Sequence, residues 1–325
     1  MQRRAFIKNA AVLGVATMAG SPLLAQSLAA PIPSESSTKT ANSANAVKTI
    51  TLNDGNTMPM VGFGTWLIRG SKCQKAVEEA LSVGYRHIDT AQMYGNEVAI
   101  GKAVKVSAIA RSKLFITTKL SSNMTFDEAS RAIDASLSRL NVDYVDLMLI
   151  HKAYAEHIAM YQAMEVAQKA GKIKSLGLSN FTPELFEGFL KNCNVLPAVN
   201  QMETHVFNQQ RALRAKMQAS NTQLCAWSPF AKGAKELLKN DVLVKIAQKH
   251  GKTSAQVVLR FLIEENIVVL PKTTHIERMR ENIAVFDFAL DADDKKALYS
   301  LDRAVDMYRW FDSKITDFFL DFFQS

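Results

Sequence analysis

The alternation of short apolar segments with helical patterns is the feature that most constrains this chain. Eight such segments lie between residues 61 and 270, and several are nearly continuous apolar runs, as is typical of parallel strands buried on both faces. The predicted strands are Val61–Thr65, Tyr85–Asp89, Leu114–Thr118, Tyr144–Ile150, Ser175–Leu178, Ala198–Asn200, Gln223–Ala226 and Ile267–Leu270. Alternating strands and helices indicate a parallel sheet, and eight strands close a barrel.

We therefore predict an α/β fold, a (β/α)8 TIM barrel. The structural alternative is a doubly wound open sheet, which is disfavoured because no G-x-G-x-x-G motif follows an early strand. Local signals mark the starts of three helices. Capping boxes begin at Thr125, opening a helix over 125–140, and at Thr253, before the last strand; Thr182 precedes a proline at a first helical position.

An N-terminal β-hairpin is predicted ahead of the barrel. The apolar runs Val47–Leu52 and Met60–Phe63 flank Asn53-Asp54-Gly55-Asn56, and Asp-Gly between two such runs is a strong hairpin signal. We assign residues 47–325 to the barrel and a C-terminal aromatic tail. Residues 30–46 are polar, small and rich in Pro and Ser, which indicates a flexible linker.

The first 29 residues have the composition of an export signal. Arg3-Arg4 begins a charged segment, an apolar run of small residues extends from Ala10 to Leu24, and Ser27-Leu28-Ala29 suits cleavage. The paired arginines followed by Phe6 and Lys8 resemble the twin-arginine signal, which carries folded proteins. We expect the twin-arginine export machinery as a partner, transient membrane contact, and a periplasmic or exported protein. A general secretory signal and an uncleaved anchor are the alternatives.

Charge and cysteine content exclude few functions. The formal net charge is +8, from 39 Lys and Arg against 31 Asp and Glu, but the basic residues are scattered, so we expect no nucleic-acid partner. Cys73, Cys193 and Cys225 lack metal-ligand spacing and are expected to be free or buried thiols, with a single bridge as the alternative.

The C-terminal tail is unusually apolar, with Asp317-Phe318-Phe319-Leu320-Asp321-Phe322-Phe323 near its end. A segment of this composition needs a cover. We expect it to pack over the barrel or pocket mouth, in a protein that is a monomer. An oligomer contact or a membrane-surface anchor are the alternatives.

Polar or aromatic residues follow all eight predicted strands. They are Thr65-Trp66, Asp89, Lys119, His151, Ser179-Asn180, Gln201, Trp227-Ser228 and Pro271-Lys272. In a parallel barrel the carboxyl ends of the strands share one face, where the active site lies. One polar residue after a strand has an ordinary structural explanation, but eight together predict a catalytic site at this face.

Several motifs resemble the aldo-keto reductase family, in the family's order and over about residues 48 to 290. They are Gly84–Glu97 (GYRHIDTAQMYGNE), Ile116–Lys119, Leu149–His151, Gly177–Phe181, Asn200-Gln201, Trp227–Pro229 and Leu270–Thr273. The resemblance implies an NADPH-dependent oxidoreductase that transfers a hydride to an aldehyde or ketone. It is strongest to small bacterial members of the diketogluconate type, which act on sugar-derived or simple carbonyls.

The residues that match the family's catalytic set are Asp89, Tyr94, Lys119 and His151. The resemblance implies that Tyr94 protonates the carbonyl oxygen and that Lys119 lowers the pKa of Tyr94. Asp89 would hold Lys119, and His151 would orient the carbonyl. A free tyrosine has a pKa of about 10, so it needs such a neighbour to donate readily.

The resemblance also implies an NADPH site and no metal. Ser179, Asn180 and Gln201 would hold the carboxamide and Trp227 would stack on the nicotinamide; Lys272, Thr273 and Arg278 would bind the 2′-phosphate, which favours NADPH because phosphate rewards charge-assisted contacts. The full expected set is Thr65, Trp66, Ser179, Asn180, Gln201, Trp227, Ser228, Lys272, Thr273, Arg278, Glu281 and Asn282.

The chain departs from the family at two places near the substrate pocket. Lys152-Ala153 follows His151 where Trp-Pro is common, and Leu120-Ser121-Ser122 follows Lys119 where an aromatic is often found. Trp66 and Trp310 remain as candidate aromatic walls. Two other functions are considered: an NADP(H)-holding redox sensor or partner-binding subunit, and a metal-dependent barrel hydrolase, for which too few His and carboxylate residues follow the strands.

Overall fold

The computed structural model describes residues 48–233 and 235–306. The predicted signal segment 1–29, the linker 30–46, Trp310 and the aromatic tail lie outside the described residues. Every other residue predicted for the site lies within them.

Eight parallel strands form one sheet in the order β10-β9-β8-β7-β6-β5-β4-β3. The two end strands also meet. Gly62 N donates to Val269 O at 2.8 Å, and Val269 N donates to Met60 O at 2.9 Å. The predicted barrel is therefore confirmed, and the open doubly wound sheet is wrong. The strands are β3 (Phe63–Gly64), β4 (His87–Asp89), β5 (Phe115–Leu120), β6 (Val145–Ile150), β7 (Ile173–Ser179), β8 (Val199–Glu203), β9 (Gln223–Trp227) and β10 (Val268–Leu270).

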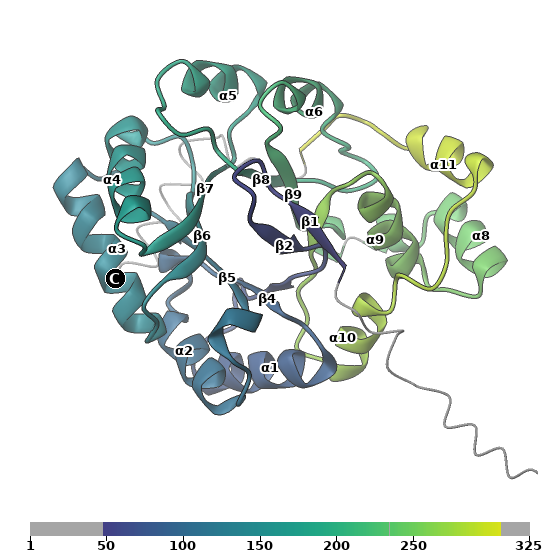
Figure 1. The fold of residues 1–325 in the computed structure, drawn as a ribbon. Helices are drawn as coiled ribbons and strands as arrows, with labels where there is room; N and C mark the ends of the chain where they lie inside the picture. Colours follow the sequence, from purple (N-terminus) through teal and green to yellow (C-terminus); the bar gives the residue numbers. More distant parts are fainter. Residues whose placement is uncertain (1–47, 234, 307–325) are drawn as a thin grey trace, which may run out of the picture. The chain divides into compact units, whose positions relative to one another are not determined.

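Helices surround the sheet, as Figure 1 shows. They are α1 (Gly70–Val83), α2 (Glu97–Val106), α3 (Phe126–Leu140), α4 (His157–Lys169), α5 (Pro183–Leu190), α6 (Arg211–Gln218), α7 (Lys235–Leu238), α8 (Asp241–His250), α9 (Ser254–Glu264), α10 (Ile276–Ile283) and α11 (Ala292–Tyr299), with 3-10 turns η1 (Gln92–Tyr94), η2 (Arg111–Lys113) and η3 (Ala231–Gly233). No helix among the described residues is long and apolar enough to span a membrane.

The predicted helix starts are largely confirmed. Thr125 and Thr253 each accept a hydrogen bond from the third backbone N–H of α3 and α9, and the reciprocal bond of a capping box is present in both. Thr182 precedes Pro183 at the start of α5, but its side chain makes no capping bond. A further capping box, at Asp291 of α11, was not predicted.

The hairpin consists of β1 (Thr49–Thr51) and β2 (Thr57–Pro59), which pair antiparallel. Its turn contains the predicted Asp-Gly, with Gly55 at φ +85°. The second arm ends earlier than the predicted Met60–Phe63: Met60 N still donates to Lys48 O at 2.8 Å, but Met60 O, Gly62 and Phe63 bond β10 and β4 of the barrel. Asn53 Nδ2 donates to Pro197 O at 3.1 Å, just before β8 begins. The hairpin therefore lies at the amino end of the barrel, away from the carboxyl ends of the strands.

Strand ends differ systematically from the prediction. Four residues that were expected to follow strands lie instead within the carboxyl-terminal parts of those strands. They are Lys119 in β5, Ser179 in β7, Gln201 in β8 and Trp227 in β9. Backbone pairing continues past the apolar run because a polar side chain does not interrupt the ladder. These side chains are thus fixed on the sheet and not on loops.

Gly62 is required by the closure of the barrel. A Cβ at this position would lie 2.5 Å from both the His87 ring and a Leu270 side-chain carbon. Contacts that short do not occur, so any larger residue would force the His87 ring and the Leu270 side chain to move.

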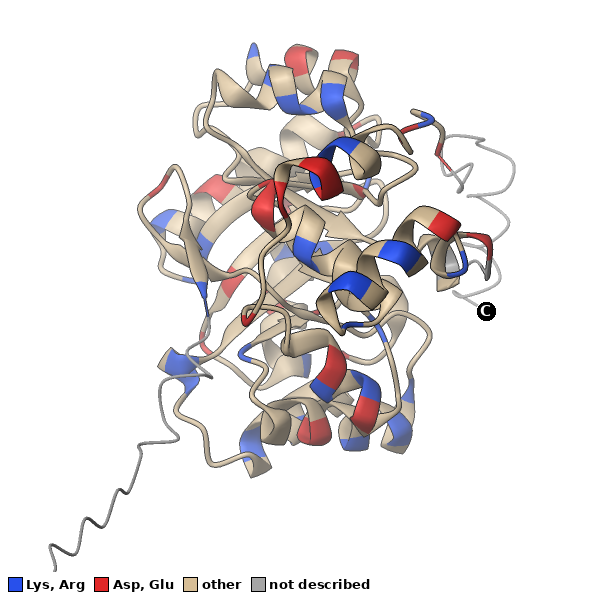
Figure 2. Ribbon diagram, turned by 90° about the vertical axis from the view of Figure 1, so that its right-hand side faces the viewer, with Lys and Arg blue, Asp and Glu red and all other residues tan. Residues whose placement is uncertain are grey.

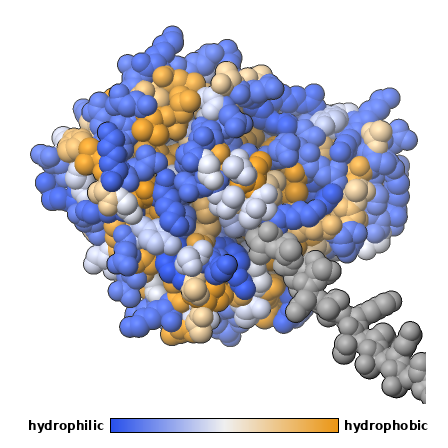
Figure 3. Space-filling model, viewed as in Figure 1, coloured by the Kyte–Doolittle hydropathy of each residue, from blue (hydrophilic) through white to orange (hydrophobic). Residues whose placement is uncertain are grey.

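The surface carries interspersed charges and small apolar patches. Figure 2 shows Lys and Arg alternating with Asp and Glu over the helices in view, as the scattering in the sequence predicts. On the face shown in Figure 3, apolar residues form small areas separated by hydrophilic ones. Apolar residues scattered in this way are ordinary on protein surfaces. The three cysteines are free thiols.

Candidate active site

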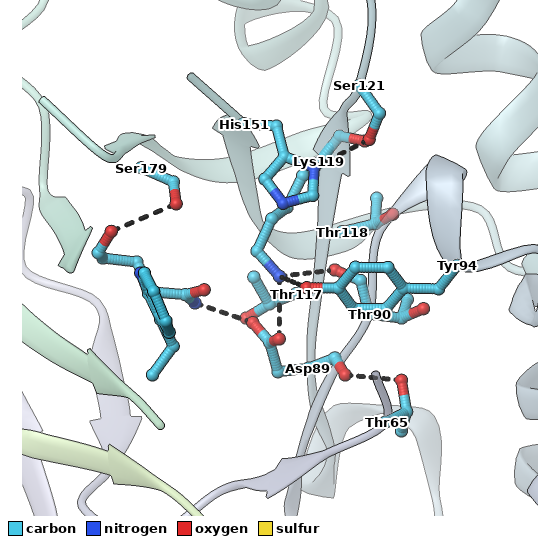
Figure 4. A network of polar contacts seen from close by, with 12 residues as sticks. Thr65, Asp89, Thr90, Tyr94, Thr117, Thr118, Lys119, Ser121, His151 and Ser179 are labelled. Carbon is cyan, nitrogen blue, oxygen red and sulfur yellow. Dashed lines mark hydrogen bonds and ion pairs between the residues drawn. The ribbon is translucent and has the colours of Figure 1, made fainter. Parts of the chain in front are cut away.

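Four polar side chains meet at the carboxyl ends of three adjacent strands. Asp89 ends β4, Lys119 lies near the end of β5, and His151 directly follows β6. Tyr94 ends η1, in the connection from β4 to α2. The structure therefore brings together all four residues predicted as the catalytic set, as Figure 4 shows.

Lys119 is the centre of this group. Its ammonium donates to Asp89 Oδ1 at 2.7 Å, to Thr90 O at 2.9 Å and to Tyr94 Oη at 3.3 Å. The Lys119 side chain is fully buried and that of Asp89 is 5% exposed. Since a buried ammonium is stable only when paired and hydrogen-bonded, the three acceptors account for its position.

Lys119 remains charged. Burial lowers the pKa of Lys119, but the charge of Asp89 and the hydrogen bonds to Asp89 and Tyr94 outweigh it, so that the pKa is raised above its ordinary value. A permanent positive charge thus lies beside the Tyr94 hydroxyl.

Lys119 lowers the pKa of Tyr94 as predicted, but the net shift is upward. Burial raises the pKa of Tyr94, Asp89 raises it further, and the opposing effect of Lys119 does not cancel this rise. The reason is that the sequence indicates the charged neighbour but not the loss of solvent around the phenol. Tyr94 is therefore held in its protonated form, and Lys119 reduces the cost of losing that proton.

His151 is neutral and tightly held. Burial lowers the pKa of His151 well below its ordinary value, and the charges of Lys119 and Lys152 lower it further. Its Nδ1 lies 2.9 Å from Ser121 Oγ. Its backbone N donates to Leu120 O at 3.0 Å, which ties the residue to the end of β5.

Two aromatic rings flank the Tyr94 side chain. The ring centroids of Trp66 and Tyr94 are 4.7 Å apart. The ring centroids of His151 and Tyr94 are 5.8 Å apart, and these two rings meet edge to face. Trp66 follows Thr65, whose hydroxyl donates to Asp89 O at 2.8 Å. The predicted wall at Trp66 is thus adjacent to the predicted proton donor.

The residues predicted for the nicotinamide lie at the carboxyl ends of the neighbouring strands β7, β8 and β9, with Asn180 directly after β7. Ser179 Oγ donates to Gln201 O at 3.1 Å, and Trp227 Nε1 donates to Asn180 Oδ1 at 3.0 Å. Asn180 Nδ2 in turn donates to His151 O at 2.9 Å. These hydrogen bonds hold the side chains of Ser179, Asn180 and Trp227 in fixed positions beside the catalytic set.

The family assignment follows from comparison with known proteins. Residues 60–303 match the Aldo/keto reductase family. The chain belongs to the aldo-keto reductase family. The resemblance seen in its motifs is thereby confirmed.

Curated relatives of this aldo-keto reductase cover most of its length. An aldo-keto reductase of Mycolicibacterium smegmatis is 41% identical over 257 residues, covering 78% of this chain and 93% of the relative. Methylglyoxal reductase DkgA of Escherichia coli K12 is 39% identical over 257 residues, with the same two coverages.

Solved structures agree with the family assignment. An aldo-keto reductase from a Medee basin deep-sea metagenome library has a TM-score of 0.79 and 40% identity, covering 81% of this chain and 98% of the other. The aldo-keto reductase AKR2E5, solved with NADPH, has a TM-score of 0.77 and 34% identity, covering 82% and 91%.

The residues of this aldo-keto reductase predicted for the adenosine end lie together around β10 and α10. Lys272 and Arg278 are exposed, and within the described part of the chain neither has an acidic partner within 4 Å. Thr273 is buried and accepts from His275 N at 3.1 Å, just before α10. Two cations and a hydroxyl of this kind suit an anionic phosphate. Glu281 and Asn282 lie on α10 beside them, and Ser228 follows β9 with φ +53°.

Asn96 was not predicted as a functional residue, although it lies in the quoted motif. Its Nδ2 donates to Thr65 O at 3.1 Å and to Ile68 O at 2.9 Å. Its Oδ1 accepts from Thr90 Oγ1 at 2.6 Å. Asn96 thereby links the turn that contains Trp66 to Thr90, whose backbone oxygen accepts a hydrogen bond from Lys119. An asparagine directly before a helix is typical of an N-cap residue, so the sequence does not indicate that Asn96 links these two segments.

Proposed function

We propose that this aldo-keto reductase reduces small aldehydes and dicarbonyls, of the methylglyoxal class, with Tyr94 as the proton donor. The observation that carries the proposal is the contact of the buried Lys119 ammonium with both Asp89 and the Tyr94 hydroxyl. The relatives called methylglyoxal reductase DkgA support the substrate class.

The chain is an NADPH-dependent oxidoreductase, as its family, its reductase relatives and a structural neighbour solved with NADPH indicate. Bound NADPH supplies the hydride that reaches the carbonyl carbon. Ser179, Asn180 and Gln201 would hold its carboxamide and Trp227 its ring. Lys272, Thr273 and Arg278 would hold its 2′-phosphate, with Glu281 and Asn282 towards the adenine.

The residues around Tyr94 handle the charge that develops on the carbonyl oxygen. Tyr94 Oη passes its proton to that oxygen, and the phenolate that remains lies 3.3 Å from the Lys119 ammonium. Asp89 keeps the ammonium in place during this transfer. His151 donates a hydrogen bond to the carbonyl oxygen and orients it towards Tyr94.

One of the two departures from the family favours a polar substrate. Lys152 follows His151 where Trp-Pro is common in the family, and its charge lowers the pKa of His151. A cation near the catalytic set suits a substrate with a second oxygen beside its carbonyl. An alternative without turnover, an NADP(H)-holding sensor, is not favoured.

We propose further that residues 1–29 are a twin-arginine signal, that 30–46 are a linker, and that the barrel from residue 47 acts in the periplasm as a monomer. The support is the Arg3-Arg4 motif and the apolar run behind it. A cofactor loaded before export would suit a route for folded proteins. Changing both arginines to lysine and fractionating the cells tests this: the protein should stay in the cytoplasm, and unchanged export would contradict the proposal.

Turnover tests the catalytic proposal. Purified protein is mixed with NADPH and a panel of aldehydes, dicarbonyls and keto-sugars, and the loss of NADPH absorbance is followed with the wild type and Tyr94→Phe. We expect reduction of dicarbonyls, and a loss of roughly 10²–10⁴-fold in Tyr94→Phe while NADPH still binds. NADPH binding without reduction of any carbonyl would favour the sensor instead.

A further inference from the structure

Ser121 lies between two polar partners at the edge of the catalytic set. Its Oγ is 2.9 Å from His151 Nδ1 and 3.1 Å from Lys119 O. Ser121 and His151 are only 5% and 6% exposed, so solvent does not substitute for either contact. Figure 4 shows the hydroxyl directed at the imidazole.

The Ser121 hydroxyl is held firmly at this position. The backbone N of Ser121 donates to Gln92 Oε1 at 3.3 Å, which links it to η1. Ser121 follows the last residue of β5, and the next strand, β6, ends at the residue before His151. Serine and imidazole are thus fixed by two adjacent strands, and their contact does not depend on a flexible loop.

A serine hydroxyl has one proton to share between these two partners. If it is donated to Lys119 O, the contact with His151 requires that Nδ1 carries the imidazole proton. If it is donated to Nδ1, then Nε2 carries the proton. Because a neutral imidazole has only one N–H, the direction of this bond decides whether Nε2 can donate at all.

We propose that Ser121 is a positioning residue that donates to Nδ1 of His151 and so keeps the imidazole proton on Nε2. The inference rests on the proposed role of His151 as a hydrogen-bond donor to the carbonyl oxygen. A donor is needed there because negative charge grows on that oxygen, whereas a lone pair on Nε2 would repel it. Ser121 acts only through His151 and touches neither substrate nor cofactor in this scheme.

The residue proposed for this role differs from the residue that the family often has at the same place. Ser121 falls in the Leu120-Ser121-Ser122 segment, where the family often has an aromatic residue and this chain has a serine hydroxyl instead. The hydrogen bond therefore accompanies one of the two departures from the family pattern.

Kinetics of three variants test the proposal. Ser121→Ala should lower kcat about tenfold, the loss of one neutral hydrogen bond in the transition state, with NADPH affinity and Tm nearly unchanged. Ser121→Thr keeps the hydroxyl and should recover most of kcat. Ser122→Ala is the matched control, and we expect no change. Equal kcat in the wild type and Ser121→Ala would overturn the proposal.

Nuclear magnetic resonance gives a readout that does not depend on turnover. Protein labelled with ¹⁵N-histidine has six histidines, and the His151 signals are assigned by their loss in His151→Gln. We expect Nε2–H for His151 in the wild type and a shift towards Nδ1–H in Ser121→Ala. Nδ1–H in the wild type, or the same tautomer in both proteins, contradicts the role of Ser121. If instead the wild type reduces no carbonyl, the proposed function fails while the tautomer result stands.

Discussion

Gln201 Nε2 donates to Asp89 Oδ2 at 2.7 Å, although the two residues are 112 positions apart. The other oxygen of the same carboxylate accepts from Lys119 at 2.7 Å. A residue proposed to hold the cofactor carboxamide is thus bonded to the residue that fixes the catalytic lysine. The orientation of the cofactor site and that of the proton donor are coupled through one buried carboxylate.

Gln201→Leu is expected to weaken both functions at once. The variant leaves one oxygen of the buried Asp89 without a donor, which costs about 1–3 kcal/mol. We predict a raised Kd for NADPH and a lowered kcat, measured by fluorescence titration and by turnover. Gln168→Leu is the control, since Gln168 Nε2 only reaches Lys174 O at the surface. A change in Kd with kcat intact would show that the two sites are not coupled.

The pH dependence of turnover follows from the protonation of Tyr94. Because burial raises the pKa of Tyr94, its acid form persists through neutral pH and past the ordinary tyrosine value of about 10. Carbonyl reduction needs that acid form, so kcat should stay level through neutral pH and fall only in strongly alkaline buffer. Oxidation of the alcohol needs the phenolate and should rise with pH. A fall of the reductive kcat near neutral pH would argue against Tyr94 as the acid.

His87 is expected to make the fold less stable in acid. Burial, together with the charge of Lys119, lowers the pKa of His87 from 6.5 to about 3. Its stabilising effect is therefore complete above pH 6.5 and is lost as the pH falls towards 3, at up to about 1.4 kcal/mol per pH unit. His87→Gln should flatten this part of the stability profile in urea unfolding. Identical slopes in the two proteins between pH 6 and about 4 would contradict this assignment.

Asn96→Ala is expected to disturb the Trp66 turn. Leu67 sits in that turn at φ +62°, a conformation that disfavours leucine, and the Asn96 amide bonds the carbonyls at both of its ends. The loss of these buried bonds should cost about 1–3 kcal/mol and reduce kcat. Asn192→Ala removes an exposed bond to Gly188 O and should have little effect on either. Urea unfolding and turnover of both variants provide the comparison.

Arg278→Ala is expected to reduce the preference for NADPH over NADH. The loss of one charge-assisted contact to the 2′-phosphate corresponds to roughly a 10–100-fold weaker Kd for NADPH, with that for NADH almost unchanged. Arg280→Ala is the matched control on α10, because Arg280 is paired with Glu277 at 2.7 Å. Equal losses for both cofactors would place Arg278 away from the phosphate.

The sequence by itself determined the barrel and the four candidate catalytic residues. Apolar runs, capping boxes and the Asp-Gly turn are local patterns, and each directs its own segment whatever the rest of the chain does. Polar residues after consecutive strands indicated one face of the sheet, since parallel strands end together. The motifs then gave the family, which the comparison of residues 60–303 confirmed.

Only the tertiary structure decided how these parts act on one another. Met60 O and Gly62 N bond Val269, and Gln201 reaches Asp89 across the barrel, because such partners depend on closure. The pKa of Tyr94 rises although Lys119 is beside it, since burial is a property of all the surrounding chain. Charge can be read from residue types, but the loss of solvent cannot, and it is the larger effect here.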